Sequence, residues 1–270
     1  MEKRHASRLS VLGHPRRLAV FRLLMRRHPD RVAAGELAGA LGVKASTLSA
    51  YLGALMQAGL VTQARAGTSL RYGVAMEAVQ DTVGYLLHDC CRGRPEICMP
   101  EPSMPGRATG PDPFGDGGRV LFVCTGNATR SILAEAILRR EAGERFEVQS
   151  AGTRPRAGPN PEALALLRAA GHDVSPLRSK PLAEVLGPGM RPFDLVVTVC
   201  DRAANEECPA WPGHPLSAHW GIPAADGAVG AVHDAVQARI RAFLALPLGA
   251  MDRRALQQAL DDIGRGRGAA

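Results

Sequence analysis

The chain has 270 residues, of which 46% are hydrophobic, and a formal net charge of +7 at pH 7. This hydrophobic content excludes disorder over most of the chain, and the length suffices for two ordinary domains. The apolar stretches are far shorter than the roughly 20 residues needed to cross a bilayer, so we expect no membrane contact. The first residues lack the apolar core of a secretory signal. We therefore expect a cytoplasmic protein whose six cysteines stay reduced.

The charge is distributed unevenly along the chain. Residues 1–98 contain 14 Lys and Arg against 7 Asp and Glu, whereas residues 99–270 contain 19 of each kind. The whole positive excess lies in the N-terminal third, which suggests a polyanion-binding module joined to a neutral one.

The composition also indicates where the chain divides. Residues 99–118 contain five Pro and five Gly and show no apolar periodicity, which indicates a linker. We expect an N-terminal domain over 1–98, the linker over 99–118, a second domain over 119–250, and a C-terminal helix and tail over 251–270.

The N-terminal domain contains helical patterns that predict a helix-turn-helix. Apolar residues at helical spacing follow Pro15, and a short helix over 36–41 is closed by Gly42. A third helix runs from residue 44 toward 59, and its Leu48, Leu52 and Leu55 should face inward. The outer face carries small donors that can reach phosphates and base edges. The predicted DNA contacts on this helix are Lys44, Ser46, Thr47, Ser49 and Tyr51.

A predicted hairpin follows this helix pair. Two short β-like runs over 60–64 and 70–74 enclose a turn, and Arg65 and Arg71 flank it where a wing would reach the phosphate backbone. Charge, helix pair and wing together predict a mainly-α winged helix-turn-helix domain that binds DNA.

Residues 7–98 resemble the ArsR-type winged-helix repressors. The likeness is carried by the core Ser46-Thr47-Leu48-Ser49-x-x-Leu52 and by the run from Leu55 to Val61. The resemblance implies a homodimer, formed through this domain, that binds operator DNA and releases it when a metal or metalloid binds.

Three cysteines end this domain. Cys90 and Cys91 close a predicted helix, and the turn that Gly93 and Pro95 make lets Cys98 fold back toward them. Three converging thiols suit a thiophilic centre such as trivalent arsenic, whereas zinc usually takes a fourth ligand. We predict an arsenite effector site, and the pattern resembles that of the arsenite-responsive repressors. The alternative is that these cysteines only pack in a dimer-forming helix.

The second domain opens with a strand, a loop and a helix that together predict an oxyanion site. The apolar run 119–124 predicts a buried parallel strand ending at Cys124, and a helix follows from residue 132. Inward amides and the helix N-terminus bind a tetrahedral oxyanion and favour the thiolate of Cys124. Arg130 can clamp two oxyanion oxygens, and Ser131 can hydrogen-bond the thiolate. The predicted oxyanion-binding residues are Thr125, Gly126, Asn127, Ala128 and Thr129.

A second thiol pair follows another predicted strand. The strand over 193–200 ends at Cys200, and Cys208 lies eight residues further on. A phosphatase needs only the first thiol, whereas a reductase needs thiols that carry two electrons away as a disulfide. The pair therefore favours redox chemistry.

Residues 119–246 resemble the low-molecular-weight tyrosine phosphatase fold, specifically its thiol-dependent arsenate reductases. Besides residues 124–131, the likeness includes the segments 150–153, 178–180, 193–201 and 219–221. The resemblance implies an α/β domain with a parallel four-stranded sheet. It also implies that Cys124 attacks arsenate, that Cys200 attacks Cys124 and releases arsenite, and that Cys208 moves the disulfide to the surface. There an external thiol reductant (thioredoxin, glutaredoxin or a small thiol) would reduce it, with no tightly bound cofactor.

The chain departs from that family pattern in three places. Ala128 replaces a serine of the loop, and the gap between the second and third thiols is one residue longer. Ala224 occupies the place of the family's general acid, and Asp226 lies two residues later. Either Asp226 replaces that acid through a shortened loop or the general acid is missing. His219 and Trp220 are interpreted as packing residues.

The sequence thus favours an arsenic-responsive repressor fused to an arsenate reductase. Two alternatives stay open. One is a protein tyrosine phosphatase fused to a regulator, because phosphate and arsenate have nearly the same shape. The other is a regulator whose second domain binds an oxyanion with little or no catalysis.

Overall fold

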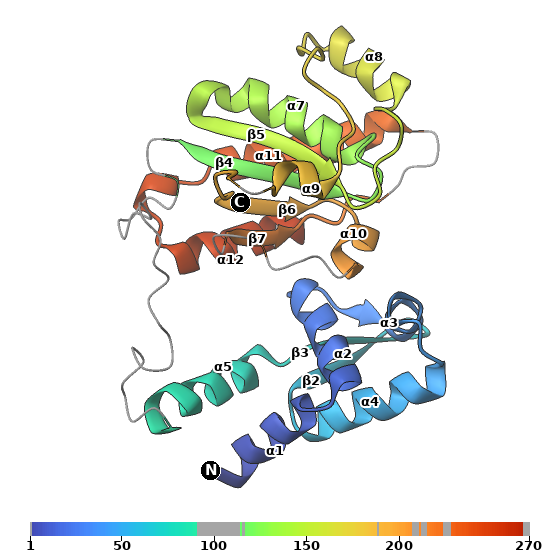
Figure 1. Ribbon diagram of the computed structural model, residues 1–270, viewed down its shortest axis with the longest axis vertical. Coiled ribbons are helices and arrows are strands. Elements are labelled where there is room, and N and C mark those ends of the chain that lie inside the picture. Colours follow the sequence, from blue (N-terminus) through green and yellow to red (C-terminus); the bar gives the residue numbers. More distant parts are fainter. Residues whose placement is uncertain are drawn as a thin grey trace. The chain divides into compact units, whose positions relative to one another are not determined.

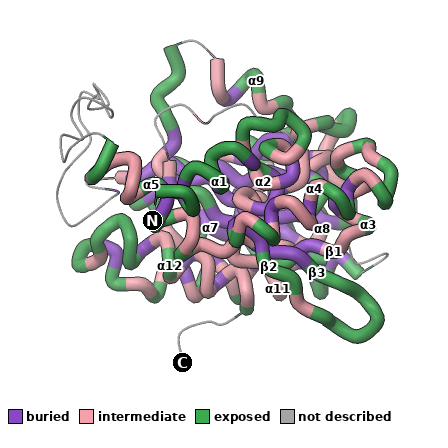
Figure 2. The backbone as a smooth tube through the Cα atoms, turned by 90° about the horizontal axis from the view of Figure 1, so that it is seen from below, coloured by how far each residue is buried: buried purple, intermediate pink, exposed green. Residues whose placement is uncertain are grey.

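The structure of the protein is a computed structural model that describes residues 2–90, 114, 117–187, 189–206, 211, 215–223 and 228–266. The chain divides into two compact units, Met1–Pro105 and Gly106–Ala270 (Figure 1). Buried residues form a separate apolar core in each unit, while the outer helix surfaces are exposed (Figure 2). Among the described residues no helix is long and apolar enough to span a membrane.

The N-terminal unit is a winged helix-turn-helix, as predicted. Its antiparallel sheet has the order β1-β3-β2, and Gly42, with a φ of 61°, ends α3 in the left-handed region that glycine adopts without strain. After α5 the chain continues in a π-helical turn, Leu86–Cys90. The elements are α1 Glu2–Leu12, α2 Pro15–Arg26, β1 Val32–Ala33, α3 Ala34–Leu41, α4 Ala45–Gln57, β2 Val61–Ala66, β3 Ser69–Val74 and α5 Met76–Tyr85.

The inward stripe predicted on α4 is confirmed, because Leu48, Leu52 and Leu55 are all buried. On α2 the outcome is different. Leu18 belongs to the apolar pattern of that helix, yet it is 39% exposed. The buried residues of α2 are Val20, Leu23 and Leu24.

Polar contacts attach α1 to α5. The buried Arg8 guanidinium donates to Asp81 Oδ2 at 2.8 Å and to Thr82 Oγ1 at 3.1 Å, and its hydrogen bond lowers the pKa of Asp81. Nearby, the ring of His5 stacks on that of Tyr85 with 4.3 Å between centroids. These contacts connect α1 to α5.

The C-terminal unit contains the predicted four-stranded parallel sheet. Its order is β5-β4-β6-β7, and every residue of β4 is buried. Because all four strands are parallel, their carboxyl ends lie at the same end of the sheet. Helix α7 packs on β4 and β5 and against α11, and α12 packs on β7. The elements are β4 Gly118–Cys124, α7 Arg130–Ala142, β5 Phe146–Gly152, α8 Pro161–Ala169, α9 Leu182–Val185, β6 Leu195–Thr198, α10 Asp201–Asn205, β7 Leu216–His219, α11 Val229–Leu244 and α12 Arg253–Gly264.

Both ends of this unit extend beyond the predicted boundaries. Phe114, inside the predicted linker, is buried and meets the ring of Phe146 edge-on at 5.2 Å. At the other end, α12 contributes buried side chains to the same core, and the indole nitrogen of Trp220 donates to the carbonyl of Leu260 at 3.2 Å. The C-terminal helix is therefore an integral part of the fold of this unit.

We predict that Leu260→Ala destabilises the C-terminal unit by about 2–5 kcal/mol, because the side chain is fully buried and its loss leaves a cavity. The measurement is denaturant unfolding of the full chain. Arg254→Ala, at an exposed position of the same helix, serves as the control and should change stability by less than about 0.5 kcal/mol. Equal stabilities of the two variants would contradict the packing of α12.

Candidate active site and DNA-binding surface

Residues 124–130, here called the oxyanion loop, connect the end of β4 to the start of α7. Cys124 is 3% exposed, and the backbone N–H of Asn127 donates to its Sγ at 3.1 Å. The Ser131 Oγ lies 3.0 Å from the same sulfur. One backbone N–H and one hydroxyl therefore lie within hydrogen-bond distance of the sulfur.

Asn127 is the centre of a buried hydrogen-bond network. Its side chain donates to the hydroxyls of Ser131 at 2.9 Å and Ser150 at 2.8 Å, and its Oδ1 accepts from the backbone N–H of Lys180 at 2.8 Å. The hydroxyl of Ser179 donates to its carbonyl at 2.6 Å. Its φ of 42° lies in the left-handed region, which asparagine adopts more readily than most residues with a side chain. The sequence placed Asn127 among the oxyanion-binding residues, but it did not predict these partners.

The network continues to a buried carboxylate. Ser150 donates to Glu135 at 2.5 Å, and Glu135 is 1% exposed. Arg139 contacts this carboxylate at 2.6 Å and Lys180 Nζ lies 3.6 Å from it. A buried carboxylate is stable only with such partners. The sequence analysis did not assign these residues a role, although Ser150 and Lys180 lie in two of the segments that carry the family resemblance.

The chain after β5 lies directly beside the oxyanion loop. A Cβ on Gly152 would sit 2.9 Å from the carbonyl oxygen of Thr125, so only glycine permits this approach. The backbone N–H groups of Arg154 and Arg156 donate to the carbonyls of Thr125 and Gly126 at 2.8 and 2.9 Å. This contact brings two arginines to the rim of the site.

A cavity of about 490 Å³ opens over the loop. Several guanidinium groups line it, which makes the potential favourable for an anion. In the structure, Arg130 Nη1 donates to the carbonyl of Ile222 at 3.1 Å, and Arg154 pairs with Glu206 at 2.9 Å. The lining residues are Cys124, Thr125, Gly126, Ala128, Thr129, Arg130, Arg154, Arg156, Asn160, Glu162, Arg202, Val229 and Val232.

The second thiol lies next to the same loop. Cys200 is buried just after β6, and its Sγ lies 3.5 Å from the Thr125 Oγ1. It also accepts the N–H of Ala203 at 3.4 Å, as the N-cap of α10. Cys124 and Cys200 are both free thiols. The structure therefore brings together two of the three thiols of the predicted relay.

Several predicted site residues lie outside the described residues. These are Cys208, Ala224 and Asp226 of the enzyme domain and Cys91 and Cys98 of the effector site. Cys90 is described and exposed. Within the described part of the chain no three metal-binding side chains form a cluster. The general acid and the arsenite site stay predictions.

The predicted DNA contacts lie on α4 and the hairpin. Lys44, Ser46 and Ser49 are exposed, whereas Thr47 and Tyr51 are half-buried. Arg65 and Arg71 are exposed as well. Since Arg65 pairs with Leu70 and Ala64 with Arg71, the two arginine side chains point to opposite faces of the hairpin.

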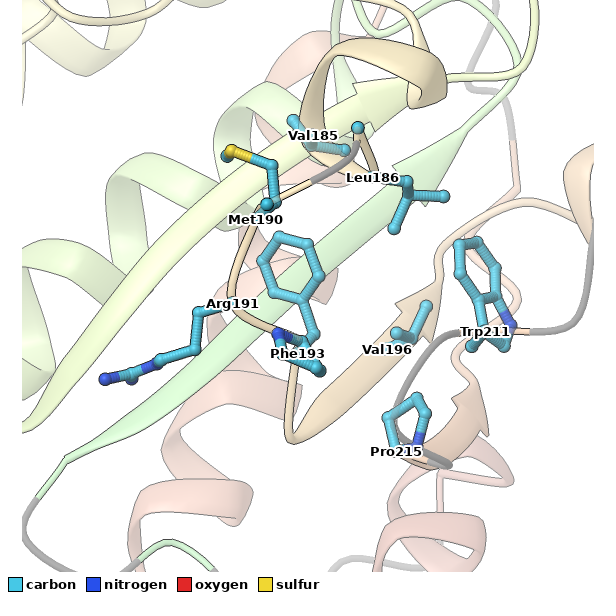
Figure 3. A pocket seen from close by; sticks show the side chains of 11 residues that line it. Val185, Leu186, Met190, Arg191, Phe193, Val196, Trp211 and Pro215 are labelled. Carbon is cyan, nitrogen blue, oxygen red and sulfur yellow. The ribbon is translucent and has the colours of Figure 1, made fainter. Parts of the chain in front are cut away.

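A second cavity, of about 270 Å³, lies near the N-terminal ends of β6 and β7 (Figure 3). This is the end of the sheet opposite the oxyanion loop, and the lining is mainly apolar; among the described residues Arg191 is the charged one and no nucleophile lines the cavity. The lining residues are Val185, Leu186, Gly187, Gly189, Met190, Arg191, Pro192, Phe193, Val196, Trp211 and Pro215.

Comparisons with known proteins agree with this description. Residues 119–215 match the family model of low molecular weight phosphotyrosine protein phosphatases, and residues 12–64 match a helix-turn-helix domain. The arsenate reductase of Bacillus licheniformis is 38% identical over 104 residues, which are 38% of this chain and 70% of that protein. That of Brevibacillus brevis is 34% identical over 129 residues, covering 46% of this chain and 92% of that protein. A solved ArsR-like transcriptional regulator from Rhodococcus sp. RHA1 is 24% identical, with a TM-score of 0.31, and covers 38% of this chain and 97% of that chain.

The C-terminal unit is thus a thiol-dependent enzyme domain of the low molecular weight phosphatase fold, preceded by a helix-turn-helix domain. The chain belongs to the family of the low molecular weight phosphatases and arsenate reductases.

We predict that Asn127→Ala destabilises the C-terminal unit by at least about 2 kcal/mol, because several buried polar groups lose their partner. Phosphate binding, measured by calorimetry, should weaken along with stability. Gln149→Ala is the control, since that amide bonds only to Glu147 at the surface. An Asn127→Ala variant with unchanged stability and phosphate affinity would show that the loop holds its shape without this side chain.

Proposed function

We propose that the protein is an arsenic-responsive transcriptional repressor fused to an arsenate reductase. The observation that carries the reductase part is a pair of buried free thiols at one loop. Cys124 lies inside the oxyanion loop, and Cys200 lies 3.5 Å from the loop's Thr125 hydroxyl. The arsenate reductases to which the chain is similar support the same assignment.

In the first step, arsenate binds with its oxygens on the loop amides and on the Arg130 guanidinium, which exchanges the carbonyl of Ile222 for the anion. The Cys124 thiolate attacks arsenic and forms an S–As(V) bond. One arsenate oxygen is protonated and leaves as water. Asp226 is the proposed proton donor, and such general-acid help is worth about 10²–10⁴ in rate.

In the second step, the Cys200 thiolate attacks the Cys124 sulfur. A disulfide forms, the S–As bond breaks, and its electron pair remains on arsenic, which leaves as arsenite. Cys208 then attacks Cys200 and releases the Cys124 thiolate. An external thiol reductant reduces the Cys200–Cys208 disulfide. Two electrons thus pass from two thiols to As(V), and the net products are arsenite, water and a disulfide.

A protein tyrosine phosphatase is the second candidate, because the loop binds phosphate and arsenate alike. The position of Cys200 favours the reductase. A phosphatase has no use for a second thiol beside its oxyanion loop, whereas a reductase needs one within reach of the first.

We predict that Cys200→Ser limits arsenate reduction to at most about one arsenite per chain, because no second thiol resolves the Cys124 adduct. The measurement is arsenite released under multiple turnover with excess thiol reductant. Hydrolysis of an aryl phosphate by the same variant tests the alternative. Wild-type arsenite turnover by Cys200→Ser would contradict the relay.

The repressor part is supported by the basic N-terminal third, by the exposed polar residues of α4 and by the arginines of the hairpin. We propose a homodimer through this unit that binds operator DNA. Arsenite captured by Cys90, Cys91 and Cys98 would shift the dimer toward a state with low DNA affinity. The size of the shift equals the preference of arsenite between the two states.

We predict that arsenite weakens operator binding by about 5–150-fold, the usual range of such coupling. The measurement is a gel shift with DNA from upstream of the protein's own coding sequence. Replacing Cys90, Cys91 and Cys98 by serine should preserve DNA affinity and abolish the response. Cys124→Ser, which removes a thiol of the other unit, should still respond. Unchanged DNA affinity with arsenite present would remove the sensor from the proposal.

A further inference from the structure

A buried histidine outside the oxyanion loop connects the two strand ends next to Cys200. His219 ends β7, and its side chain is 2% exposed. One ring nitrogen, Nδ1, lies 2.9 Å from the Thr198 Oγ1 at the end of β6. The other, Nε2, lies 2.9 Å from the Asp201 Oδ1 at the start of α10. Both ring nitrogens are therefore occupied, one on each side of the turn that carries Cys200.

The turn from residue 198 to 201 is short, so a bridge across it restricts the cysteine within it. Backbone hydrogen bonds already attach the start of this turn to β4 on one side and to the end of β7 on the other. The N–H of Val199 donates to the carbonyl of Val123 at 2.8 Å, and the N–H of Trp220 donates to that of Thr198 at 2.8 Å. The side chain of His219 adds the connection to α10 that these backbone bonds lack.

Two glycines make room for this bridge. A Cβ on Gly221 would lie 3.0 Å from both the Asp201 Oδ1 and the His219 Nε2, close enough to crowd the pair. A Cβ on Gly264, in α12, would lie 2.3 Å from the His219 carbonyl oxygen. Helix α12 can therefore approach the backbone at the end of β7 only because position 264 has no side chain. Gly221 leaves room for the His219–Asp201 pair, and Gly264 leaves room for the strand end that carries His219.

We propose that His219 is a positioning residue for the Cys200 thiol. By bridging Thr198 and Asp201 it holds the start of α10 in the orientation that keeps the Cys200 Sγ beside the oxyanion loop. This inference rests on the proposed relay, in which Cys200 attacks the Cys124 sulfur in line with the breaking S–As bond. A small displacement of an attacking atom lowers the rate of such a step strongly. The sequence analysis interpreted His219 as a packing residue, and this proposal adds that it positions Cys200.

The test uses the full chain carrying Cys208→Ser throughout, which stops the proposed relay at the Cys124–Cys200 disulfide, and two measurements. The first is the rate at which arsenate produces the Cys124–Cys200 disulfide in a single turnover, followed by mass spectrometry. The second is the rate of Cys200 alkylation by iodoacetamide without arsenate. In His219→Ala we expect the first rate to fall and the second to rise, each by about tenfold. Arsenate affinity should stay within about twofold, because the ring nitrogens of His219 bond to Thr198 and Asp201 and not to the oxyanion loop.

Other variants separate positioning from a general loss of stability. Asp201→Ala removes the other end of the bridge at a side chain that is 59% exposed, so it should fold and change both rates in the same direction. His219→Gln retains a donor toward Asp201 and should recover more of the disulfide rate than His219→Asn. Asp234→Ala is the matched control, because it removes a surface His–Asp contact on α11. It should leave both rates unchanged.

The outcomes distinguish the two levels of the proposal. If the Cys208→Ser chain with His219 intact forms no Cys124–Cys200 disulfide with arsenate, the relay fails, and the alkylation rates still decide whether His219 restrains Cys200. If His219→Ala and Asp201→Ala retain wild-type values of both rates while only thermal stability falls, His219 is a packing residue and the inference is overturned.

Discussion

The geometry of the oxyanion loop depends on one buried amide side chain. Asn127 holds a left-handed backbone conformation inside the protein, where it is shielded from water. Its side chain connects the start of α7, the end of β5 and the segment around Lys180. If these bonds were lost, the backbone would relax toward an ordinary conformation, and the N–H that faces the Cys124 sulfur would turn away. The position of the N–H group at the Cys124 sulfur therefore depends on the hydrogen bonds of the Asn127 side chain, which does not itself touch the sulfur.

The hydrogen-bond network around Asn127 requires two further features: a close approach of the end of β5 to the oxyanion loop, and partners for the charge of the buried Glu135. Gly152 lets the end of β5 touch the loop, and Glu135 accepts from Ser150 inside the core. A lone buried carboxylate would be too costly, and Lys180 and Arg139 offset its charge. Buried networks of this kind define a single arrangement because any partial version leaves polar groups unpaired. In the turn that carries Cys200, the hydrogen bonds of His219 to Thr198 and Asp201 join the residues on both sides of the thiol.

The two units of the chain carry complementary chemistry in the proposed function. In that proposal arsenite, the product of the C-terminal unit, is the ligand of the N-terminal unit. Repression would then respond to arsenate through its reduction product.

The sequence by itself determined the features that local patterns encode. The apolar run before Cys124 specified a buried strand, the spacing of Leu48, Leu52 and Leu55 specified the inner face of α4, and Gly42 specified the end of α3. The strand that ends at Cys124, followed by a loop and a helix, predicted the oxyanion loop. Each of these signals lies within a few residues of the structure that it predicts.

Only the tertiary structure decided which distant residues support the site. The bond of Asn127 to Lys180, that of His219 to Asp201 and that of Trp220 to Leu260 join residues that are 53, 18 and 40 positions apart. Phe114, in a segment rich in Pro and Gly, is buried because two rings far along the chain meet it. Apolar periodicity predicts which face of a helix or strand is buried, but it does not predict which other element packs against that face. Hydrogen-bond partners across the core are specified by packing, which the order of residues along the chain does not display.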